Sequence, residues 1–312
     1  MESAFRICCQ CGLVVLCLIL SFYPAHAASN CRGTGVWLQV LGSGGPELIQ
    51  GRASTSYLVW QDGKARVLVD MGSGSMLRFE QSGARIEDLE VILLSHLHVD
   101  HSADIPALVK AAYFGERTRD LPIYGPSGNA LMPDTSAFLQ SLLGEPDGAY
   151  RYLAGYLDGN ESFRLVPRVV AAEGTSTHLA LDRPGLKLTA VPVHHGPIPS
   201  LAWRVDIGGR SLAFSGDMNG DNGTLSALAA GADLLVAHNA IPEGAKGAAR
   251  NLHMPPSVIG EIAAAAGIRQ LVLSHRMKRT LGREQGTTKE IRKRYGGPLM
   301  FADDLQCFRV VR

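Results

Sequence analysis

Three histidines and an aspartate stand within one short stretch of the chain, His96-Leu97-His98-Val99-Asp100-His101. The stretch follows the apolar run 91–94, so we expect it to leave the end of a buried strand. Imidazole nitrogens and carboxylate oxygens are the natural ligands of zinc and similar ions. In such a loop His96 and His98 can face one way while Asp100 and His101 face the other, which suits two adjacent ions. A polar loop without an ion is the alternative, but ten histidines in 312 residues rarely cluster in this way.

Further candidate ligands share one feature, which is that each directly follows an expected strand. These pairs of strand and ligand are 186–193 with His194 and His195, 211–215 with Asp217, and 271–273 with His275. Taken singly, a histidine at a strand end is more often a hydrogen-bonded structural residue. Several strands that each deliver a ligand at their carboxyl end instead predict a convergent metal cluster.

The elements that must position these residues read as one α/β domain without repeats. Apolar runs typical of strands alternate with helical stripes, which favours two sheets covered by helices. The expected strands are 36–41, 56–60, 65–70, 91–94, 186–193, 202–207, 211–215, 234–237 and 270–273, and the expected helices contain 105–112 and 258–266. Residues 126–180 are expected to form a partly helical insertion, which is either a surface excursion or a cap over a substrate pocket.

The first 27 residues are expected to lie outside this fold. Residues 12–22 are an apolar run too short to span a membrane, and Ala25-His26-Ala27 is a small-x-small cleavage site. These features predict that residues 1–27 are a secretory signal peptide, with a retained N-terminal anchor as the alternative. The mature chain, residues 28–312, is then exported to the periplasm or secreted, and we expect it to make no contact with a membrane.

Cysteine usage and net charge bear on a possible disulfide and on binding to nucleic acid. Four of the six cysteines lie in the expected signal, which leaves Cys31 and Cys307 near the two ends of the mature chain. In an oxidising compartment these two could form a single bridge, although two unrelated thiols are the alternative. Lys and Arg number 30 against 29 Asp and Glu, a net charge of +1. This balance argues against gripping nucleic acid by bulk charge, but it does not exclude a small basic patch.

The pattern of candidate ligands resembles the metallo-β-lactamase superfamily over roughly residues 36–308. The resemblance implies an αββα sandwich, an α/β fold with a two-metal site on one edge. Three further stretches resemble the ribonuclease Z and arylsulfatase-like branch of the superfamily. These stretches are 41–46 together with Arg52, 67–72 with its structural Asp70, and His253-Met254-Pro255 ahead of a helix.

The same resemblance implies two zinc ions and assigns their ligands. His96, His98 and His195 would bind the first ion, Asp100, His101 and His275 the second, and Asp217 would bridge them. A hydroxide between two ions about 4 Å apart is a nucleophile at neutral pH, and Asp100 could accept the proton of its parent water. His195 is preferred to His194 because adjacent strand residues face opposite sides and the family ligand usually precedes a glycine, here Gly196.

Two departures from the ribonuclease Z pattern bear on the substrate. Ribonuclease Z carries a long arm that grips tRNA between its third histidine and the bridging aspartate, whereas this chain has only 196–216 there. The branch usually places a glutamate after a strand-end histidine, and this chain has Asn239 after His238. His253 could still donate a proton to the leaving group, oriented by Asn239 but without an acidic partner; a surface histidine at a helix N-terminus is the alternative. We therefore expect nucleic acid to be an unlikely partner.

The sequence thus predicts an exported dinuclear-zinc hydrolase of a small anionic ester, most simply a phosphodiester or sulfate ester. Arg52 and Arg204 are possible contacts for the anion, although structural pairing is the simpler role for either. The alternatives are a lactonase or β-lactamase, a ribonuclease Z-like nuclease, and a metal-binding module without catalysis. Asp217 argues against a β-lactamase, whose members usually lack this carboxylate, and the complete ligand set argues against a module that has lost catalysis.

Overall fold

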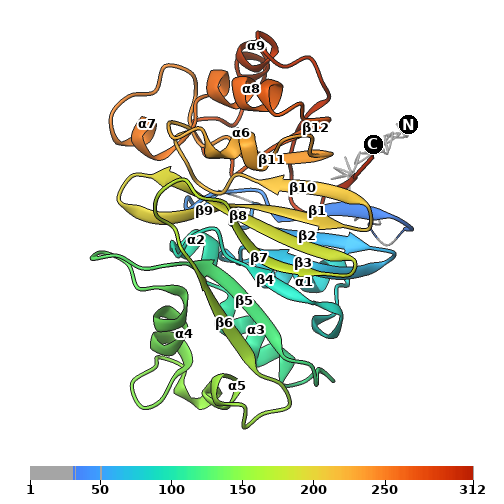
Figure 1. Cartoon of the computed structure of the whole chain (residues 1–312), viewed down its shortest axis with the longest axis vertical. Coiled ribbons are helices and arrows are strands. Elements are labelled where there is room, and N and C mark those ends of the chain that lie inside the picture. Colours follow the sequence, from blue (N-terminus) through green and yellow to red (C-terminus); the bar gives the residue numbers. More distant parts are fainter. Residues whose placement is uncertain (1–30, 32, 50, 312) are drawn as a thin grey trace, which may run out of the picture.

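The computed structural model describes residues 31, 33–49 and 51–311, so the expected signal peptide, residues 1–27, lies outside the described residues. Within the described ranges, two sheets of seven strands each are stacked on one another (Figure 1). The first sheet has the order β14-β1-β2-β3-β4-β5-β6, with β1 (Val36–Gly42), β2 (Ser56–Gln61), β3 (Lys64–Val69), β4 (Val91–Leu93), β5 (Leu121–Pro126), β6 (Leu165–Val170) and β14 (Cys307–Arg309). The second has the order β13-β12-β11-β10-β9-β8-β7, with β7 (His178–Arg183), β8 (Leu186–His195), β9 (Ile198–Ile207), β10 (Arg210–Phe214), β11 (Leu234–His238), β12 (Gln270–Ser274) and β13 (Leu299–Phe301).

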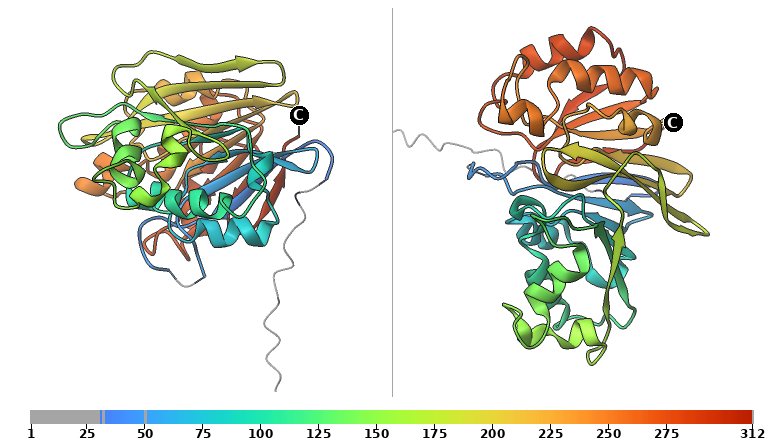
Figure 2. Two further views of the ribbon diagram at one scale, coloured as in Figure 1. Left: turned by 90° about the horizontal axis from the view of Figure 1, so that it is seen from below. Right: turned by 60° about the vertical axis from the view of Figure 1, so that its left-hand side comes forward.

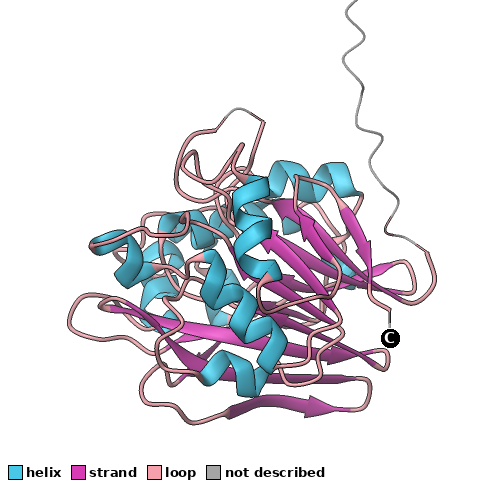
Figure 3. Cartoon of the chain, turned by 90° about the horizontal axis from the view of Figure 1, so that it is seen from above, coloured by secondary structure: helices cyan, strands magenta, loops and turns pink. Residues whose placement is uncertain are grey.

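Helices cover the outer faces of both sheets, with one group at each end of the molecule (Figure 2). The first group is α1 (Ser75–Ser82), α2 (Val99–Ser102), α3 (Ile105–Ala112), α4 (Thr135–Leu143) and α5 (Gly155–Asp158). The second group is α6 (Thr224–Leu228), α7 (Ala248–Leu252), α8 (Pro256–Ala265) and α9 (Glu284–Arg292). From above, the second group lies over the strands of the sheet beneath it (Figure 3). The αββα sandwich expected from the sequence is confirmed.

Three apolar layers hold the sandwich together, and the alternation of side chains along the strands builds them. Val59 in β2 packs in the cluster between the sheets, which also contains Trp203 of β9. Its neighbour Leu58 faces the opposite way, into the cluster with Leu108 of α3. A third cluster joins the second sheet to Ile259 of α8. Strands such as β4 and β11 are apolar on both faces because each face is covered.

Parallel strands bring the chemically active loops to one edge of the sandwich. β3, β4 and β5 run parallel in the first sheet, and β10, β11 and β12 run parallel in the second. Because parallel strands end at the same edge, the loops that follow β4, β10, β11 and β12 lie together there. The antiparallel pair β8 and β9 adds its turn, at residues 195–198, to the same region.

Residues 126–180 differ in part from the insertion expected from the sequence. They contain α4 and α5, but they also contain β6, which pairs with β5 and extends the first sheet. β6 was missed because it is an edge strand that includes Pro167, a residue that weakens strand predictions. Near the β8–β9 turn, the Asn129 side chain donates a hydrogen bond of 2.8 Å to the carbonyl of Pro197. A cap over the substrate pocket therefore stays a prediction.

A disulfide joins Cys31 to Cys307, as predicted, with Cα atoms 5.6 Å apart. β1, which follows Cys31, pairs with β14, which begins at Cys307, so the bond joins segments that lie side by side in one sheet. In the part of the chain that the structure describes, none of the helices has the length and apolarity needed to span a bilayer.

Candidate metal centre

His96 and His98 lie in the loop that follows β4, and Asp100 and His101 lie in α2 directly after it. His96 and His101 are fully buried and Asp100 is 4% exposed. His98 is the N-cap of α2 and keeps an extended backbone, so the change from loop to helix falls inside the motif. The ring of His96 nevertheless lies next to both partners, with its centroid 4.7 Å from that of His98 and 4.0 Å from that of His101.

His96, His98 and His195 form a first group of imidazoles. Their ligand atoms lie within 4.8 Å of one another, and His98 Nδ1 is 3.1 Å from His96 Nε2 and 3.4 Å from His195 Nε2. The other nitrogen of His195 lies 2.9 Å from the carbonyl of Leu252, which fixes the orientation of its ring. Burial lowers the pKa of all three imidazoles. Neutral imidazoles that converge in this way suit a metal ion, which binds the deprotonated ring.

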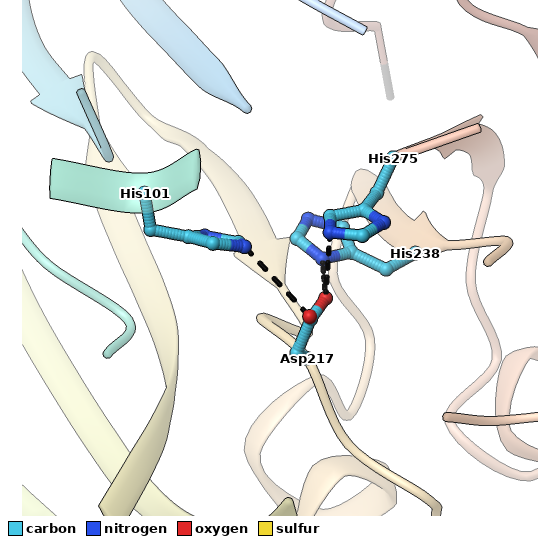
Figure 4. A group of neighbouring side chains, drawn as sticks. All are labelled: His101, Asp217, His238 and His275. Carbon is cyan, nitrogen blue, oxygen red and sulfur yellow. Dashed lines mark hydrogen bonds and ion pairs between the residues drawn. The ribbon is translucent and has the colours of Figure 1, made fainter. Parts of the chain in front are cut away.

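His101, Asp217 and His275 form a second group, together with His238 (Figure 4). Asp100 Oδ2 adjoins this group, 3.4 Å from His101 Nε2 and 3.2 Å from His275 Nε2. Burial raises the pKa of the Asp100 carboxyl, but the neighbouring imidazoles of His101 and His275 outweigh burial and hold it well below its usual range. The carboxylate is therefore ionised at neutral pH.

Asp217 lies between the two groups. Its Oδ2 is 3.8 Å from His195 Nε2 and 3.7 Å from His101 Nε2, and its Oδ1 is 3.3 Å from His275 Nε2. Although burial raises the pKa of this carboxyl, His275 and His253 lead the nearby groups that hold it well below the usual range. A buried anion between two sets of imidazoles is the arrangement that a bridging ligand requires.

Asp70, at the end of β3, fixes the ring of His101. Its carboxylate accepts hydrogen bonds from the backbone and hydroxyl of Ser95, at 2.7 and 2.8 Å, and lies 2.8 Å from His101 Nδ1. The ring's other nitrogen, Nε2, is thereby directed at Asp100 and Asp217. Supporting carboxylates of this kind orient the histidine ligands of metals.

The backbone is strained at two positions of the centre. Asp70 and His275 both adopt left-handed conformations, with φ of 56° and 53°. Such conformations are uncommon for residues other than glycine and persist where the surroundings impose them. Gly45 shows how closely His275 is enclosed, because a Cβ atom there would lie 2.6 Å from the Cε1 atom of the imidazole.

The donor set fits metal ions. Among the described residues, the buried nitrogens His101 Nε2, His253 Nδ1 and His275 Nδ1 have no hydrogen-bond partner. Buried polar atoms without a partner are costly, and a bound ion removes that cost for those that reach it. The seven ligands expected from the sequence are thus brought into one connected site, with His195 rather than His194 facing it. His194 is exposed, and its Nδ1 lies close to the side-chain nitrogen of Asn219.

His238 is a member of the site that the sequence analysis did not assign. Its Nδ1 lies 2.7 Å from Asp217 Oδ1, and its ring is buried at the end of β11. The strand-end rule that selected Asp217 and His275 applies equally to His238, because β11 lies between β10 and β12. Its position at the end of an apolar strand is therefore the signal in the sequence that identifies it.

His253 and Asn239 differ from expectation. His253 is buried at the end of α7, not a surface residue, and its Nδ1 is 3.8 Å from Asp217 Oδ2. The Asn239 amide donates instead to the carbonyl of Ile241, at 3.5 Å. Burial lowers the pKa of His253 to about 3, so its imidazole is neutral.

The two arginines considered for anion binding have structural partners. Arg52 pairs with Asp303, and Arg204 pairs with Asp206 at 3.0 Å. Arg204 lies in the middle of β9 and also donates to the carbonyls of Leu228 and Ala230. Structural pairing, the simpler role expected for both, is what the structure shows.

A family model described as the β-lactamase superfamily domain matches residues 65–276. The chain belongs to the β-lactamase superfamily. The matched region contains the ligand-bearing stretches from His96 to His275. The resemblance to this superfamily seen in the sequence is confirmed.

Curated relatives of this chain are named ribonuclease Z. Ribonuclease Z of Mycobacterium avium (strain 104) is 29% identical over 284 residues, covering 87% of this chain and 97% of that protein. Ribonuclease Z of Mycobacterium sp. (strain KMS) is 32% identical over 247 residues, covering 76% and 82%. These relatives confirm the resemblance to ribonuclease Z and, with the family, make the chain a metal-dependent hydrolase of ester bonds.

Solved structures of the same superfamily share the fold. Human tRNase Z, short form, superimposes with a TM-score of 0.67 at 20% identity, covering 88% of this chain and 100% of that one. Zn²⁺-bound PqqB from Methylobacterium extorquens superimposes with a TM-score of 0.59 at 18% identity, covering 87% and 99%.

The expectation that nucleic acid is an unlikely partner is wrong on these findings. The relatives that align over most of the chain are named ribonuclease Z, and the nuclease alternative is better supported than a hydrolase of small esters alone. The physical reason for the error is that a net charge of +1 describes the whole chain. A metal centre can bind a single phosphodiester without a large basic surface.

Proposed function

We propose that this chain is a phosphodiesterase of the ribonuclease Z type, which hydrolyses phosphodiester bonds in RNA with two zinc ions. The observation that carries the proposal is the position of Asp217 between the two groups of imidazoles, within 3.8 Å of both His195 and His101. The ribonuclease Z relatives support RNA as the substrate class. The fold shared with Zn²⁺-bound PqqB supports zinc.

The protein's own residues then have distinct tasks. His96, His98 and His195 would hold one ion, His101, Asp100 and His275 the other, and Asp217 both. Bound ions supply an activated water at neutral pH and neutralise charge on the phosphoryl oxygens. The Asp100 carboxylate is ionised and buried beside His101 and His275, which suits a ligand; its low pKa makes it a weak base for the proton of the attacking water.

His253 would act on the leaving group. Its neutral imidazole lies beside Asp217 at the edge of the two groups, with Leu252, its neighbour in the chain, bonded to His195. A neutral imidazole still carries one N–H, which can donate a hydrogen bond to an oxygen that gains charge. The geometry thus supports contact with the leaving group, without the acidic partner usual for that role.

We further propose that the chain is exported. Its disulfide, Cys31–Cys307, is typical of oxidising compartments, and residues 1–27 have the features of a signal peptide. Fractionation of cells that express the full chain should place the protein outside the cytoplasm, and mass spectrometry should find Ala28 at the N-terminus. A cytoplasmic protein that retains Met1 would contradict export and leave the hydrolase proposal untouched.

The substrate is tested with four compounds of different classes. We expect the zinc-loaded protein to cleave bis(p-nitrophenyl) phosphate and a single-stranded RNA oligonucleotide, and to cleave p-nitrophenyl sulfate and nitrocefin far more slowly. Asp217→Ala should abolish the phosphodiesterase activity. Asp221→Ala is the matched control, because Asp221 is an exposed aspartate of the same loop paired with Arg250 at 2.9 Å. Faster cleavage of the sulfate ester or the β-lactam would overturn the proposal.

Any RNA must be held by the surface around the metal centre. The chain between His195 and Asp217 is taken up by β9, β10 and the tight turns beside them. A long arm therefore does not fit between these two ligands. Contacts with the substrate would therefore come from the surface hollows beside the metal centre.

A further inference from the structure

One hollow of about 470 Å³ opens directly beside the metal centre. One wall is formed by Val99 and Asp100 of α2, and Asp100 is also one of the proposed metal ligands. The rest of its lining comes from the loop between β1 and β2 and from residues at and before the start of α1. A group bound in this hollow would therefore lie beside Asp100, a proposed metal ligand.

The rim of the hollow is apolar and open to solvent. Leu48, Leu77 and Val99 line it, and they are 94%, 61% and 67% exposed. Single exposed apolar side chains are common on protein surfaces, but several around one concave site indicate a ligand with an apolar face. These three residues come from three separate segments of the chain, so the fold, not one hydrophobic stretch, brings them together.

Tight packing fixes the lining of the hollow against the metal centre. Gly45, in the β1–β2 loop directly before the lining residue Pro46, lies against the ring of His275. Gly72, which leads into α1, lies so close to the carbonyl of Asp100 that a Cβ atom would collide with it. The hollow is therefore held at a constant position relative to the proposed ligands His275 and Asp100.

Both arginines that line the hollow form ion pairs with carboxylates. Arg52 pairs with Asp303 and also donates to the hydroxyl of Ser43, while Arg78 pairs with Asp304 at 3.1 Å. Cations already paired in this way are poor binders of a second anion. The hollow is thus built for a flat or apolar group, and the phosphate is left to the metal centre.

We propose that this hollow binds the nucleobase next to the phosphate that is cleaved, with Leu48, Leu77 and Val99 as its apolar contacts. The proposal rests on the phosphodiesterase function proposed above and specifies where a nucleoside of the substrate lies. Nucleobases have flat, weakly polar faces that pack on apolar side chains, and such stacking tolerates any base sequence.

The first experiment compares two phosphodiesters that share a leaving group. Bis(p-nitrophenyl) phosphate retains an aromatic group after cleavage, whereas methyl p-nitrophenyl phosphate retains only a methyl group. In Leu48→Ser and Leu77→Ser, the ratio of kcat/KM for the aromatic ester to that for the methyl ester should fall about tenfold. Leu179→Ser is the matched control, because Leu179 is a 59% exposed leucine of β7. An unchanged ratio in both rim variants would overturn the proposal.

The second experiment measures binding alone, so it remains decisive if the protein cleaves neither ester and the phosphodiesterase proposal fails. Equilibrium dialysis compares adenosine 5′-monophosphate with ribose 5-phosphate, which has the same phosphate but no base. We expect the nucleotide to bind about tenfold more tightly to the wild type, and Leu48→Ser to remove the difference. Equal binding of the two ligands to the wild type, or a difference that survives in Leu48→Ser, would show that the hollow does not hold a base.

Discussion

The Nδ1 atom of His238 lies 2.7 Å from Asp217 Oδ1, while its Nε2 atom lies 3.0 Å from the hydroxyl of Tyr57. Tyr57, in β2, belongs to the first sheet, and His238, in β11, belongs to the second. All three side chains are buried. A chain of hydrogen bonds thus crosses the sandwich and ends on the carboxylate that links the two groups of imidazoles, which leaves Oδ2 directed at His101 and His195.

Removing either support of Asp217 should weaken metal binding. We expect His238→Gln to lower the affinity for zinc about 10–100-fold, the range usual for residues that orient a ligand, and Tyr57→Phe to have a smaller effect. The measurement is competition with a chromogenic chelator. If His238 is instead a metal ligand itself, Tyr57→Phe should leave the affinity unchanged while His238→Gln lowers the number of bound ions per chain.

Asp217 itself should be required for both metal content and hydrolysis. Metal analysis of the wild type should find close to two transition-metal ions per chain. Asp217→Ala should lower that occupancy and reduce kcat by at least about a thousandfold, because it removes the carboxylate between the proposed ion positions. Full activity in Asp217→Ala would exclude a mechanism that depends on a bridging carboxylate.

The bond between Cys31 and Cys307 should contribute measurably to stability. The two cysteines are separated by 276 residues, and closing so long a loop is worth up to about 5 kcal/mol in the chain-entropy model. We expect the Cys31→Ser/Cys307→Ser double variant to lose about 2–5 kcal/mol in its free energy of unfolding, measured with urea. Thiol titration of the unfolded, unreduced mature protein should detect no free thiol, and two thiols per chain would refute the bond.

The stability of the metal-free protein should fall on acidification. Burial lowers the pKa of His253 to about 3 and that of His238 to about 4. Unfolded histidines titrate near 6.5, so between about pH 6.5 and 4 the unfolded chain binds more protons than the folded one and the folded state loses stability. His101 and His275 have pKa values that are raised by nearby carboxylates despite burial. His101 and His275 are protonated in both the folded and the unfolded state below about pH 6.5. They therefore do not contribute to the change in the free energy of unfolding between about pH 6.5 and 4.

Denaturation of EDTA-treated protein with urea at pH 7 and pH 5 checks this expectation. His253→Gln removes one of the five histidines whose pKa is lowered by burial and should make the pH dependence shallower. A free energy of unfolding that is equal at the two pH values would contradict it.

The metal-binding stretch is the part of the site that could be predicted best from the sequence, because its side-chain chemistry and its local pattern agree. The stretch from His96 to His101 combines metal-binding side chains with an apolar strand before it, and the structure places these residues as that pattern implies. The short strand β13 was not predicted, because three residues carry too little pattern. The hydrogen bonds that connect Tyr57 through His238 to Asp217 could not be predicted from the sequence either, because they depend on how the two sheets are stacked.

The proposed ligands are drawn from loops of both sheets, from His96 near the first third of the chain to His275 near its end. No fragment of the chain that ends before His275, the residue after β12, contains the complete set. The complete site can therefore bind metal only after the chain has been made as far as His275 and the two sheets have stacked. Under the export proposed above, a chain that crosses the membrane unfolded would acquire its ions only at its destination, where the supply of metal would then set how much of the enzyme is active.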